Sequence, residues 1–181
     1  MSEKSPWKAL SEEVRYENPW IRVEEHQVIN PSGNPGIYGT VNFKNRAVAI
    51  VPLFTNGDVL LVGQFRYPLQ EYHWEIPMGG APEGESTLLY AQRELKEETG
   101  FSAQNWEPLL TMHLSPSITQ ELGLTYLATN LQEGERALEE TEDIVVKRLP
   151  FEVVFQQVMK GEITNAMTVA SVMKIRLLGL A

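Results

Sequence analysis

Apolar and polar residues alternate along the first part of the chain, which is typical of strands with one exposed face. The alternation begins at Trp20. Residues 30–36, rich in Asn, Pro, Ser and Gly, predict a turn into a second strand at 37–43. Two continuous apolar runs then flank Thr55-Asn56-Gly57-Asp58, which predicts a hairpin; the runs cover residues 47–53 and 59–65.

The second half of the chain mixes helical periods with further strands. Residues 86–99 contain no Gly or Pro and have helical spacing, and Gly100 stands where such a helix would end. We expect further strands at 74–76, 107–113, 123–130 and 144–149, helices at 151–160 and 165–178, and a mobile segment over the first ten residues. Strands with helices between them predict an α/β fold in which helices cover a mixed sheet.

The composition is that of one ordinary globular domain of 181 residues, with a net charge of −9. Because this charge repels a phosphate backbone and no run of Lys or Arg forms a basic groove, we expect no nucleic-acid partner. There are no cysteines, which excludes disulfides and cysteine-held zinc or iron–sulfur sites. The sequence has neither a signal peptide nor an apolar span of about 20 residues, so we expect a cytoplasmic protein with no membrane partner.

Three carboxylates share one face of the helix expected at 86–99. Glu94, Glu97 and Glu98 are neighbours at spacings of three and four residues. Such carboxylates repel one another, and a divalent cation removes the repulsion because magnesium prefers clustered carboxylate oxygens. The alternative is an acidic face that is simply solvated, as on many surface helices.

The surrounding pattern favours the metal site. Gly79 is followed after five residues by Glu85, and after seven more by the run Arg93-Glu94-Leu95-Lys96-Glu97-Glu98-Thr99-Gly100-Phe101. This spacing matches the Nudix box without a gap, and only aromatic Phe101 departs from the aliphatic residue usual at its position. On these residues the chain resembles the Nudix hydrolases, which cut a diphosphate linked to another group.

The resemblance implies a fold and a metal site. The fold would be an α/β/α sandwich with a mixed β-sheet, preceded by a small N-terminal antiparallel sheet. Glu94, Glu98 and the backbone carbonyl of Met78 would be metal ligands, with Mg²⁺ as the ion and Mn²⁺ as an alternative. Glu97 would be a catalytic residue, either as a further ligand or as the holder of the attacking water.

Three other residues of the box would support this site. Gly79 would permit a tight turn from strand to loop. Arg93 would pair with Glu85 and so fix the loop to the helix. We therefore interpret Gly79, Glu85 and Arg93 as structural supports rather than chemical actors.

Segments outside the box resemble the Nudix enzymes that hydrolyse ADP-ribose and nucleoside diphosphate sugars. Pro116 lies sixteen residues after Gly100, where a proline marks the ADP-ribose pyrophosphatases, within Ser115-Pro116-Ser117-Ile118-Thr119-Gln120-Glu121. Other similar segments are Arg46-Ala47-Val48, Gln64-Phe65-Arg66-Tyr67-Pro68, Glu75-Ile76-Pro77 and Glu140-Thr141-Glu142-Asp143-Ile144. The resemblance implies a nucleotide-sugar substrate bound by Arg46, Arg66, Glu75 and Pro116.

Arg66 is the strongest of these substrate candidates, because it follows a strand end and suits a charge-assisted contact with a phosphate. The alternative for Arg66 is an ion pair with Glu71 or Glu75. Arg46 is a weaker candidate for the same contact. Met78 stands where the ADP-ribose enzymes commonly have alanine, which changes the pocket beside the metals and leaves the choice of sugar open.

The acidic segment around residue 140 would close over the substrate. By resemblance, Glu140 would be the general base and Glu142 an additional metal ligand. The neighbours Glu139 and Asp143 could serve instead, and on composition alone this segment is a flexible charged loop. Since no Cys is present and no Ser has a suitable His partner, water is the expected nucleophile.

The resemblance also implies two parts and a dimer. Residues 1–45 would form N-terminal strands that exchange between the subunits of a homodimer, and residues 46–181 the Nudix hydrolase domain. Two other functions stay open: a nucleoside triphosphate pyrophosphohydrolase, against which Pro116 argues, and a non-catalytic ADP-ribose-binding sensor. Sensors of this kind typically lose the glutamates of the box, whereas this chain keeps them.

Overall fold

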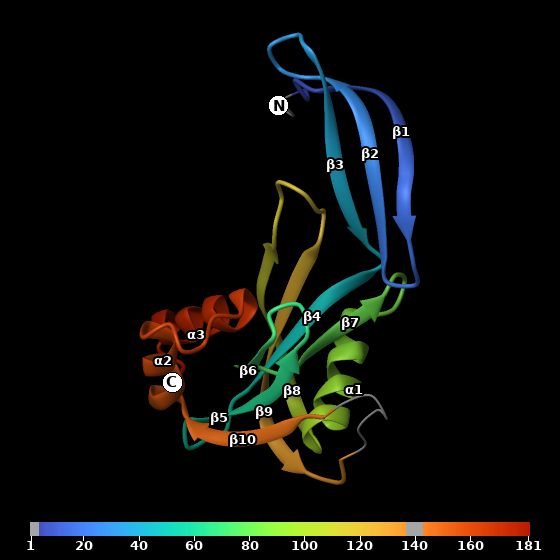
Figure 1. Cartoon of the computed structure of the whole chain (residues 1–181). Coiled ribbons are helices and arrows are strands. Elements are labelled where there is room, and N and C mark those ends of the chain that lie inside the picture. The colour runs from blue at the N-terminus through green and yellow to red at the C-terminus, as the bar shows by residue number, and fades with distance from the viewer. Residues whose placement is uncertain (1–3, 137–142) are drawn as a thin grey trace. The chain divides into compact units, whose positions relative to one another are not determined.

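The computed structural model describes residues 4–136 and 143–181. These residues form ten strands in three sheets, and three helices (Figure 1). The chain divides into two compact units. The first ends at Asn45 and also takes in His113–Glu121; the second holds Arg46–Met112 and Leu122–Ala181.

The first unit is an antiparallel sheet of three strands in sequence order, with bounds β1 Lys8–Glu17, β2 Ile21–Ile29 and β3 Pro35–Phe43. The strand β1 corrects the expectation of a mobile first ten residues for residues 8–10, which are its first three positions. Its apolar positions alternate weakly, and two register shifts against β2 break the period of two on which the sequence interpretation depended. The segment 113–121 joins this unit through a bridge between Val41 and Thr119.

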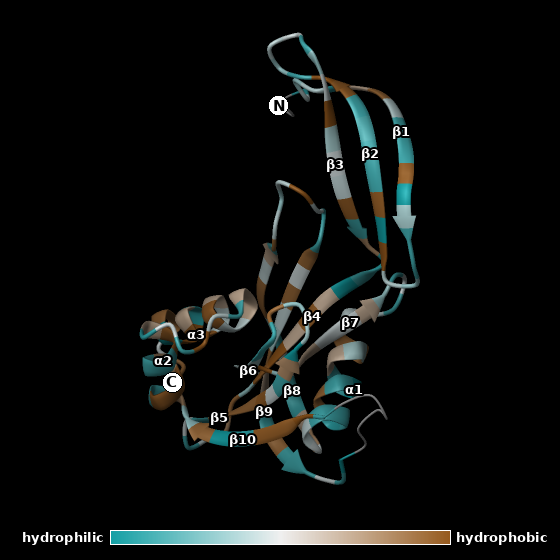
Figure 2. Ribbon diagram, viewed as in Figure 1, coloured by the Kyte–Doolittle hydropathy of each residue, from teal (hydrophilic) through white to brown (hydrophobic). Residues whose placement is uncertain are grey.

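The second unit contains a four-stranded sheet in the order β7-β4-β9-β8. The bounds are β4 Asn45–Pro52, β7 Met78–Pro82, β8 Phe101–His113 and β9 Leu122–Glu133, and β4 runs parallel to β9. A three-stranded sheet in the order β10-β5-β6 lies in the same unit, with β5 Asp58–Arg66, β6 Glu71–Glu75 and β10 Val145–Pro150. Figure 2 shows hydrophobic stretches along β5 and β9 and bands of both colours along β1, β2 and β3.

Two helical layers cover the four-stranded sheet. Helix α1 (Thr87–Thr99) packs Ala91 and Leu95 on Val48 and Ile50 of β4. Alternate residues of the strands point to the other face of the sheet. On that face, Thr125 of β9 accepts a hydrogen bond from the buried Ser171 of α3 (Ala166–Leu178). Helix α2 (Phe151–Met159) packs beside α3. Figure 1 shows α1 and the α2–α3 pair on opposite sides of the strands, which confirms the α/β/α architecture.

The hairpin expected around Gly57 forms only in part. Gly57 has a positive φ of 83°, and its N–H donates to Phe54 O, so the turn itself is present. Beyond one bridge between Leu53 and Val59, however, β4 and β5 separate into different sheets. The strands of the second unit therefore form two sheets, because β4 pairs with β7 and β9 while β5 pairs with β6 and β10.

Local sequence signals set the ends of the helices. The Ser86 side chain accepts a hydrogen bond from Leu89 N at the start of α1, and Gly100 ends it in the left-handed conformation at φ 81°. Asn165 caps α3 in the same way through Thr168 N. None of the helices in the described part of the chain is long and apolar enough to cross a membrane.

Candidate active site

Helix α1 buries two of its three central carboxylates. Glu94 is 7% exposed and Glu98 is 2% exposed, although both are charged residues on a helix with a well-packed apolar stripe. Buried carboxylates are costly unless they are paired or bind a cation. The burial of Glu94 and Glu98 therefore argues against the interpretation of this face as merely solvated.

Gly79 brings the backbone of β7 close to the Glu94 carboxylate. A Cβ atom at this position would lie 2.6 Å from Glu94 Cδ and would also collide with the Tyr90 hydroxyl. Gly79 lies inside a strand and is not among the glycines with positive φ. The expectation of a tight turn at Gly79 is therefore wrong: the residue is required for the close approach of backbone to carboxylate.

Glu98 contacts the residue before this glycine. Met78 N donates a hydrogen bond to Glu98 Oε2 over 3.1 Å. One carboxylate of α1 thus meets the backbone of Met78 and the other meets that of Gly79. The Met78 carbonyl, the expected third ligand, belongs to the same stretch of backbone.

The pKa of Tyr90 responds to the negative charge of the carboxylates on α1. Burial raises the pKa of its hydroxyl above the ordinary value, and the charge of Glu94 and a hydrogen bond to that carboxylate raise this pKa further. Glu98 adds to the same effect. The Tyr90 hydroxyl therefore stays protonated and donates to Glu94.

The third glutamate of the cluster lies apart from the buried pair. Glu97 is half-buried, and its Oε2 is 3.9 Å from Arg93 Nε. Arg93 also donates to Glu85, with Nη1 to Oε1 at 2.7 Å and Nη2 to Oε2 at 3.3 Å. The expected pairing of Arg93 with Glu85 is confirmed, and it ties the loop before α1 to the helix.

The donors present fit a hard divalent cation. Glu94, Glu98 and the Met78 carbonyl offer oxygen atoms, and the space that a Cβ at Gly79 would fill lies directly against Glu94. Within residues 4–136 and 143–181, no group of three or more His, Asp or Glu side chains is closed enough to hold a metal by itself. The other expected acids, Glu140 and Glu142, lie outside the described residues.

Arg136, the last described residue before 137–142, contacts two backbone carbonyls. Its Nε donates to the carbonyl of Glu98 over 2.6 Å, and its Nη2 donates to the carbonyl of Ile144 over 2.7 Å. Residues on both sides of 137–142 are therefore fixed at the C-terminal end of α1. The sequence interpretation missed Arg136, because no local pattern reveals that its partners are two backbone carbonyls.

Arg66 and Glu75 form a close bidentate pair. Arg66 Nε and Nη2 lie 2.9 Å and 2.6 Å from the two oxygens of Glu75, which is buried. The hydrogen bond to Glu75 is the largest cause that raises the pKa of Arg66. The negative charges of Glu75 and Glu98 also raise this pKa. The pair matches one alternative expected for Arg66, and it places the guanidinium within the electrostatic reach of Glu98. Arg46 is exposed at the start of β4.

A family model for the NUDIX domain matches residues 43–168, about two thirds of the chain and the whole box. The chain belongs to the Nudix family. A second model, the nucleoside diphosphate sugar hydrolase N-terminal domain, matches residues 7–41, which form most of the N-terminal sheet. The resemblance that the sequence suggested is therefore confirmed.

Two bacterial ADP-ribose pyrophosphatases are similar in sequence to this Nudix chain. An ADP-ribose pyrophosphatase of Mycobacterium tuberculosis is 36% identical over 132 residues, which cover 71% of this chain and 64% of the relative. One from Bacillus subtilis is 32% identical over 133 residues, 72% of each chain. The chain thus spans less than two thirds of the first relative. A solved structure described as an ADP compounds hydrolase superposes with a TM-score of 0.86 over 98% of this chain and 96% of the other. At 22% identity, that likeness shows the fold alone.

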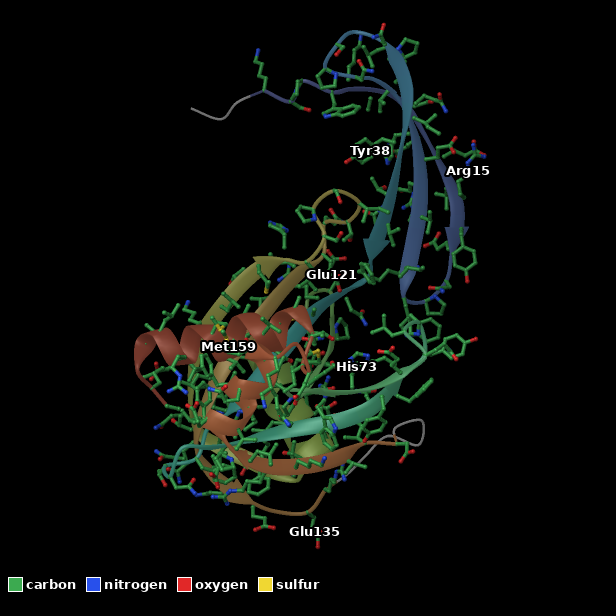
Figure 3. All side chains as sticks on the ribbon, turned by 60° about the vertical axis from the view of Figure 1, so that its left-hand side comes forward. Arg15, Tyr38, His73, Glu121, Glu135 and Met159 are labelled. Carbon is green, nitrogen blue, oxygen red and sulfur yellow. The ribbon has the colours of Figure 1, made fainter. Side chains whose placement is uncertain are left out.

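Pro116, expected to contact substrate, belongs to the first unit of this Nudix chain. It lines a cavity of about 370 Å³ together with Tyr38, His113 and other residues of β3 and the segment 113–121. The Tyr38 hydroxyl (labelled in Figure 3) donates to the carbonyl of Ser117 over 2.7 Å. The substrate role of Pro116 stays a prediction.

Asn165 is a polar residue of the Nudix domain that the sequence interpretation used only as a helix start. Its Nδ2 donates to Glu75 Oε2 over 3.3 Å and contacts Met78 Sδ at 3.7 Å. An Asn before a helical period signals a cap. The contact with residues about ninety positions earlier carries no local signal, so only the fold reveals it.

Proposed function

We propose that the chain hydrolyses the pyrophosphate bond of ADP-ribose or of nucleoside diphosphate sugars, releasing a nucleoside monophosphate and a sugar phosphate. The observation that carries this proposal is the convergence of two buried carboxylates, Glu94 and Glu98, on the backbone of Met78 and Gly79. Burial of two like charges side by side suits a site completed by a divalent cation.

Magnesium is the proposed metal. Glu94, Glu98 and the Met78 carbonyl would hold it, and Glu142 would be a further ligand from outside the described residues. When bound, such ions neutralise phosphate oxygens and lower the pKa of a water. The presence of the oxygen donors supports a hard cation but does not separate Mg²⁺ from Mn²⁺.

The residues of the chain would then position substrate and move one proton. Water attacks one phosphorus, the bond from that phosphorus to the bridging oxygen breaks, and the leaving phosphate keeps the oxygen. Glu140 would take the proton of the water as general base, with Glu97 holding the water. The anchoring of both neighbouring segments by Arg136 beside Glu98 supports this assignment of Glu140.

The phosphates of the substrate would contact Arg66, and Arg46 is a second candidate. Arg66 is pre-oriented by its bidentate pair with Glu75, so less side-chain entropy is lost when it binds a phosphate. Pro116 would also contact the substrate. The match of residues 7–41 to the N-terminal domain of nucleoside diphosphate sugar hydrolases supports this class of substrate over nucleoside triphosphates.

We further propose a homodimer that exchanges its N-terminal strands, with residues 1–45 as the exchange region and 46–181 as the hydrolase domain. Large apolar side chains are exposed in the first unit, including Trp20 between β1 and β2 at 65% and Ile37 of β3 at 67%. Exposed apolar surface of this kind marks an interface. Analytical ultracentrifugation tests this proposal, since Ile37→Asp should shift the protein from dimer to monomer. The cytoplasmic location expected from the sequence stays a prediction.

The test of the reaction is a product analysis with magnesium and five substrates: ADP-ribose, GDP-mannose, UDP-glucose, ATP and dGTP. Release of a nucleoside monophosphate from ADP-ribose or a nucleotide sugar is the expected result. Cleavage of triphosphates alone would transfer the chain to the triphosphate pyrophosphohydrolases. Tight binding of ADP-ribose without any product would identify a sensor domain.

A further inference from the structure

A small cavity lies in the second unit at the N-terminal end of α3. Its volume is about 200 Å³, and it is lined by Arg66, Pro68, Leu69, His73, Glu75, Thr164 and Asn165. Pockets for whole drug-sized ligands are usually about 300–1,000 Å³. The cavity therefore suits one part of a nucleotide sugar rather than the complete molecule.

Asn165 presents an amide to this cavity in a fixed orientation. Its Oδ1 accepts hydrogen bonds from Thr168 N at 2.9 Å and Thr168 Oγ1 at 3.1 Å. Since the oxygen is used in capping α3, the amide nitrogen must point toward Glu75 Oε2, 3.3 Å away. The cap thus determines which end of the amide a ligand would meet.

Glu75 retains hydrogen-bonding capacity within this arrangement. It accepts two hydrogen bonds from Arg66 and one from Asn165. A carboxylate has about four acceptor sites, so one remains. A ligand that donates a hydrogen bond can use it without displacing Arg66.

His73, labelled in Figure 3, adds a second polar group to the wall. Its Nε2 is buried and makes no hydrogen bond with the described residues, although Glu71 Oε2 lies 3.4 Å away. Buried polar groups are usually hydrogen-bonded, and an exception calls for an explanation. A ligand group in the cavity would supply the partner.

The cavity adjoins the candidate metal site. Asn165 Nδ2 contacts the sulfur of Met78 at 3.7 Å, and Met78 N is bonded to Glu98. A group bound to Asn165 in the cavity would therefore be separated from Met78, a proposed metal ligand, by Asn165 alone. Because the walls combine a carboxylate, an amide, a hydroxyl and an imidazole, they match a ligand that both donates and accepts many hydrogen bonds.

We propose that this cavity receives the distal sugar of the substrate, and that Asn165 and Glu75 recognise the hydroxyl groups of that sugar. This inference rests on the proposed pyrophosphatase function and identifies the residues that select the sugar. Met78 takes part by contact with Asn165, which gives the methionine before the box a place in sugar selection. The nucleoside half of the substrate lies outside this cavity.

Two variants of Asn165 test the assignment while keeping the helix cap. Asn165→Ser keeps a capping oxygen and loses the amide, and Asn165→Asp keeps the shape and replaces the amide with a carboxylate facing Glu75. The measurements are the inhibition constants of ribose 5-phosphate and AMP against ADP-ribose hydrolysis, with calorimetric binding of ribose 5-phosphate in magnesium. Both variants should weaken ribose 5-phosphate about tenfold and leave AMP within about twofold. If GDP-mannose is the better substrate, mannose 1-phosphate and GMP are the probes.

Asn56→Ser is the matched control, because Asn56 is also a hydrogen-bonded Asn of the second unit but lies at the turn before β5. It should change neither constant. Equal weakening of sugar phosphate and nucleotide in the Asn165 variants, or no weakening of either, would overturn the sugar assignment. A wild-type protein that cuts neither ADP-ribose nor any nucleotide sugar would instead overturn the proposed function itself.

Discussion

The backbone N–H of Met78 donates a hydrogen bond to Oε2 of Glu98, twenty positions later, and this bond fixes the start of β7 against α1. Both residues are expected metal ligands, one through its carbonyl and the other through its carboxylate. The same bond that orders the strand also orients the carboxylate. The Nudix helix and the strand before it are therefore positioned as one element.

Gly79→Ala should destroy this arrangement. The added Cβ would collide with Glu94 and Tyr90, and overpacking of this kind costs about 1–3 kcal/mol. Displacement of a catalytic carboxylate by about 1 Å can cost about 100-fold in rate. We expect a kcat at least about 100-fold lower, measured by AMP release, with a lower midpoint of urea unfolding.

Gly39→Ala is the control for this substitution, because no atom lies within 4 Å of a Cβ at that position. It should leave kcat unchanged. Full activity of Gly79→Ala would contradict this prediction, because it would show that hydrolysis does not depend on the present position of the Glu94 carboxylate.

The Arg93–Glu85 pair should support activity more than stability. Both side chains are partly exposed, and exposed pairs are worth about 0.2–1 kcal/mol. A double-mutant cycle with Arg93→Ala and Glu85→Ala should give a coupling energy in this range by urea unfolding, with kcat reduced in each single variant. The Arg148–Asp58 pair, also partly exposed, serves as the control and should affect stability alone. Equal kcat losses in both pairs would refute a specific supporting role for Arg93.

Arg136→Ala should lower kcat by about tenfold or more, because it removes the hydrogen bonds that join Glu98 and Ile144 through Arg136, next to the part of the chain that carries the proposed base. The binding of magnesium should weaken less than kcat falls, since Glu94, Glu98 and the Met78 carbonyl remain in place and Glu142 is the one proposed ligand from the affected segment. Steady-state kinetics and a magnesium titration measure the two effects. A loss of magnesium affinity with unchanged kcat at saturating metal would contradict this account.

Glu121 should make the stability of the first unit depend on pH. Burial raises the pKa of this half-buried carboxyl above its ordinary value of 4.5 (Glu121 is labelled in Figure 3). Between the ordinary and the raised pKa, the unfolded chain binds fewer protons than the folded one, so stability falls as pH rises through that window. Glu121→Gln should therefore raise the melting temperature at pH 7 and leave it unchanged below pH 4.5.

The exposed Glu83→Gln, which removes the same charge, is the comparison for this experiment. Its melting temperature should not show the same dependence on pH. An equal gain from both variants would mean that net charge, rather than the burial of Glu121, sets the effect.

Local signals predicted the part of the site that lies on one element. Ser86 and Gly100 set the ends of α1, and the box placed Arg93 against Glu85. The sheets were less predictable. Strands β4 and β5 separate after one bridge, because pairing with distant strands prevails over a good turn. The contacts of Asn165 and Arg136 join residues from separate elements, so no spacing along the chain predicts them.

Gly79 illustrates the limit of interpretation from residue type. The sequence favoured glycine for a turn, since glycine is common where the backbone bends sharply. The structure uses glycine instead for the absence of a side chain beside Glu94. Both uses leave the same residue in the same place, and only the neighbouring carboxylate distinguishes them.

The most direct test of the metal site is Glu98→Gln, which keeps the side-chain shape and the acceptor for Met78 N but removes the charge. Release of AMP from ADP-ribose is measured against magnesium concentration, with manganese binding followed by electron paramagnetic resonance. We predict that kcat falls at least about 100-fold and that manganese binding weakens, while the melting temperature stays close to that of the wild type. A Glu98→Gln protein that binds manganese and hydrolyses ADP-ribose as the wild type does would contradict the account.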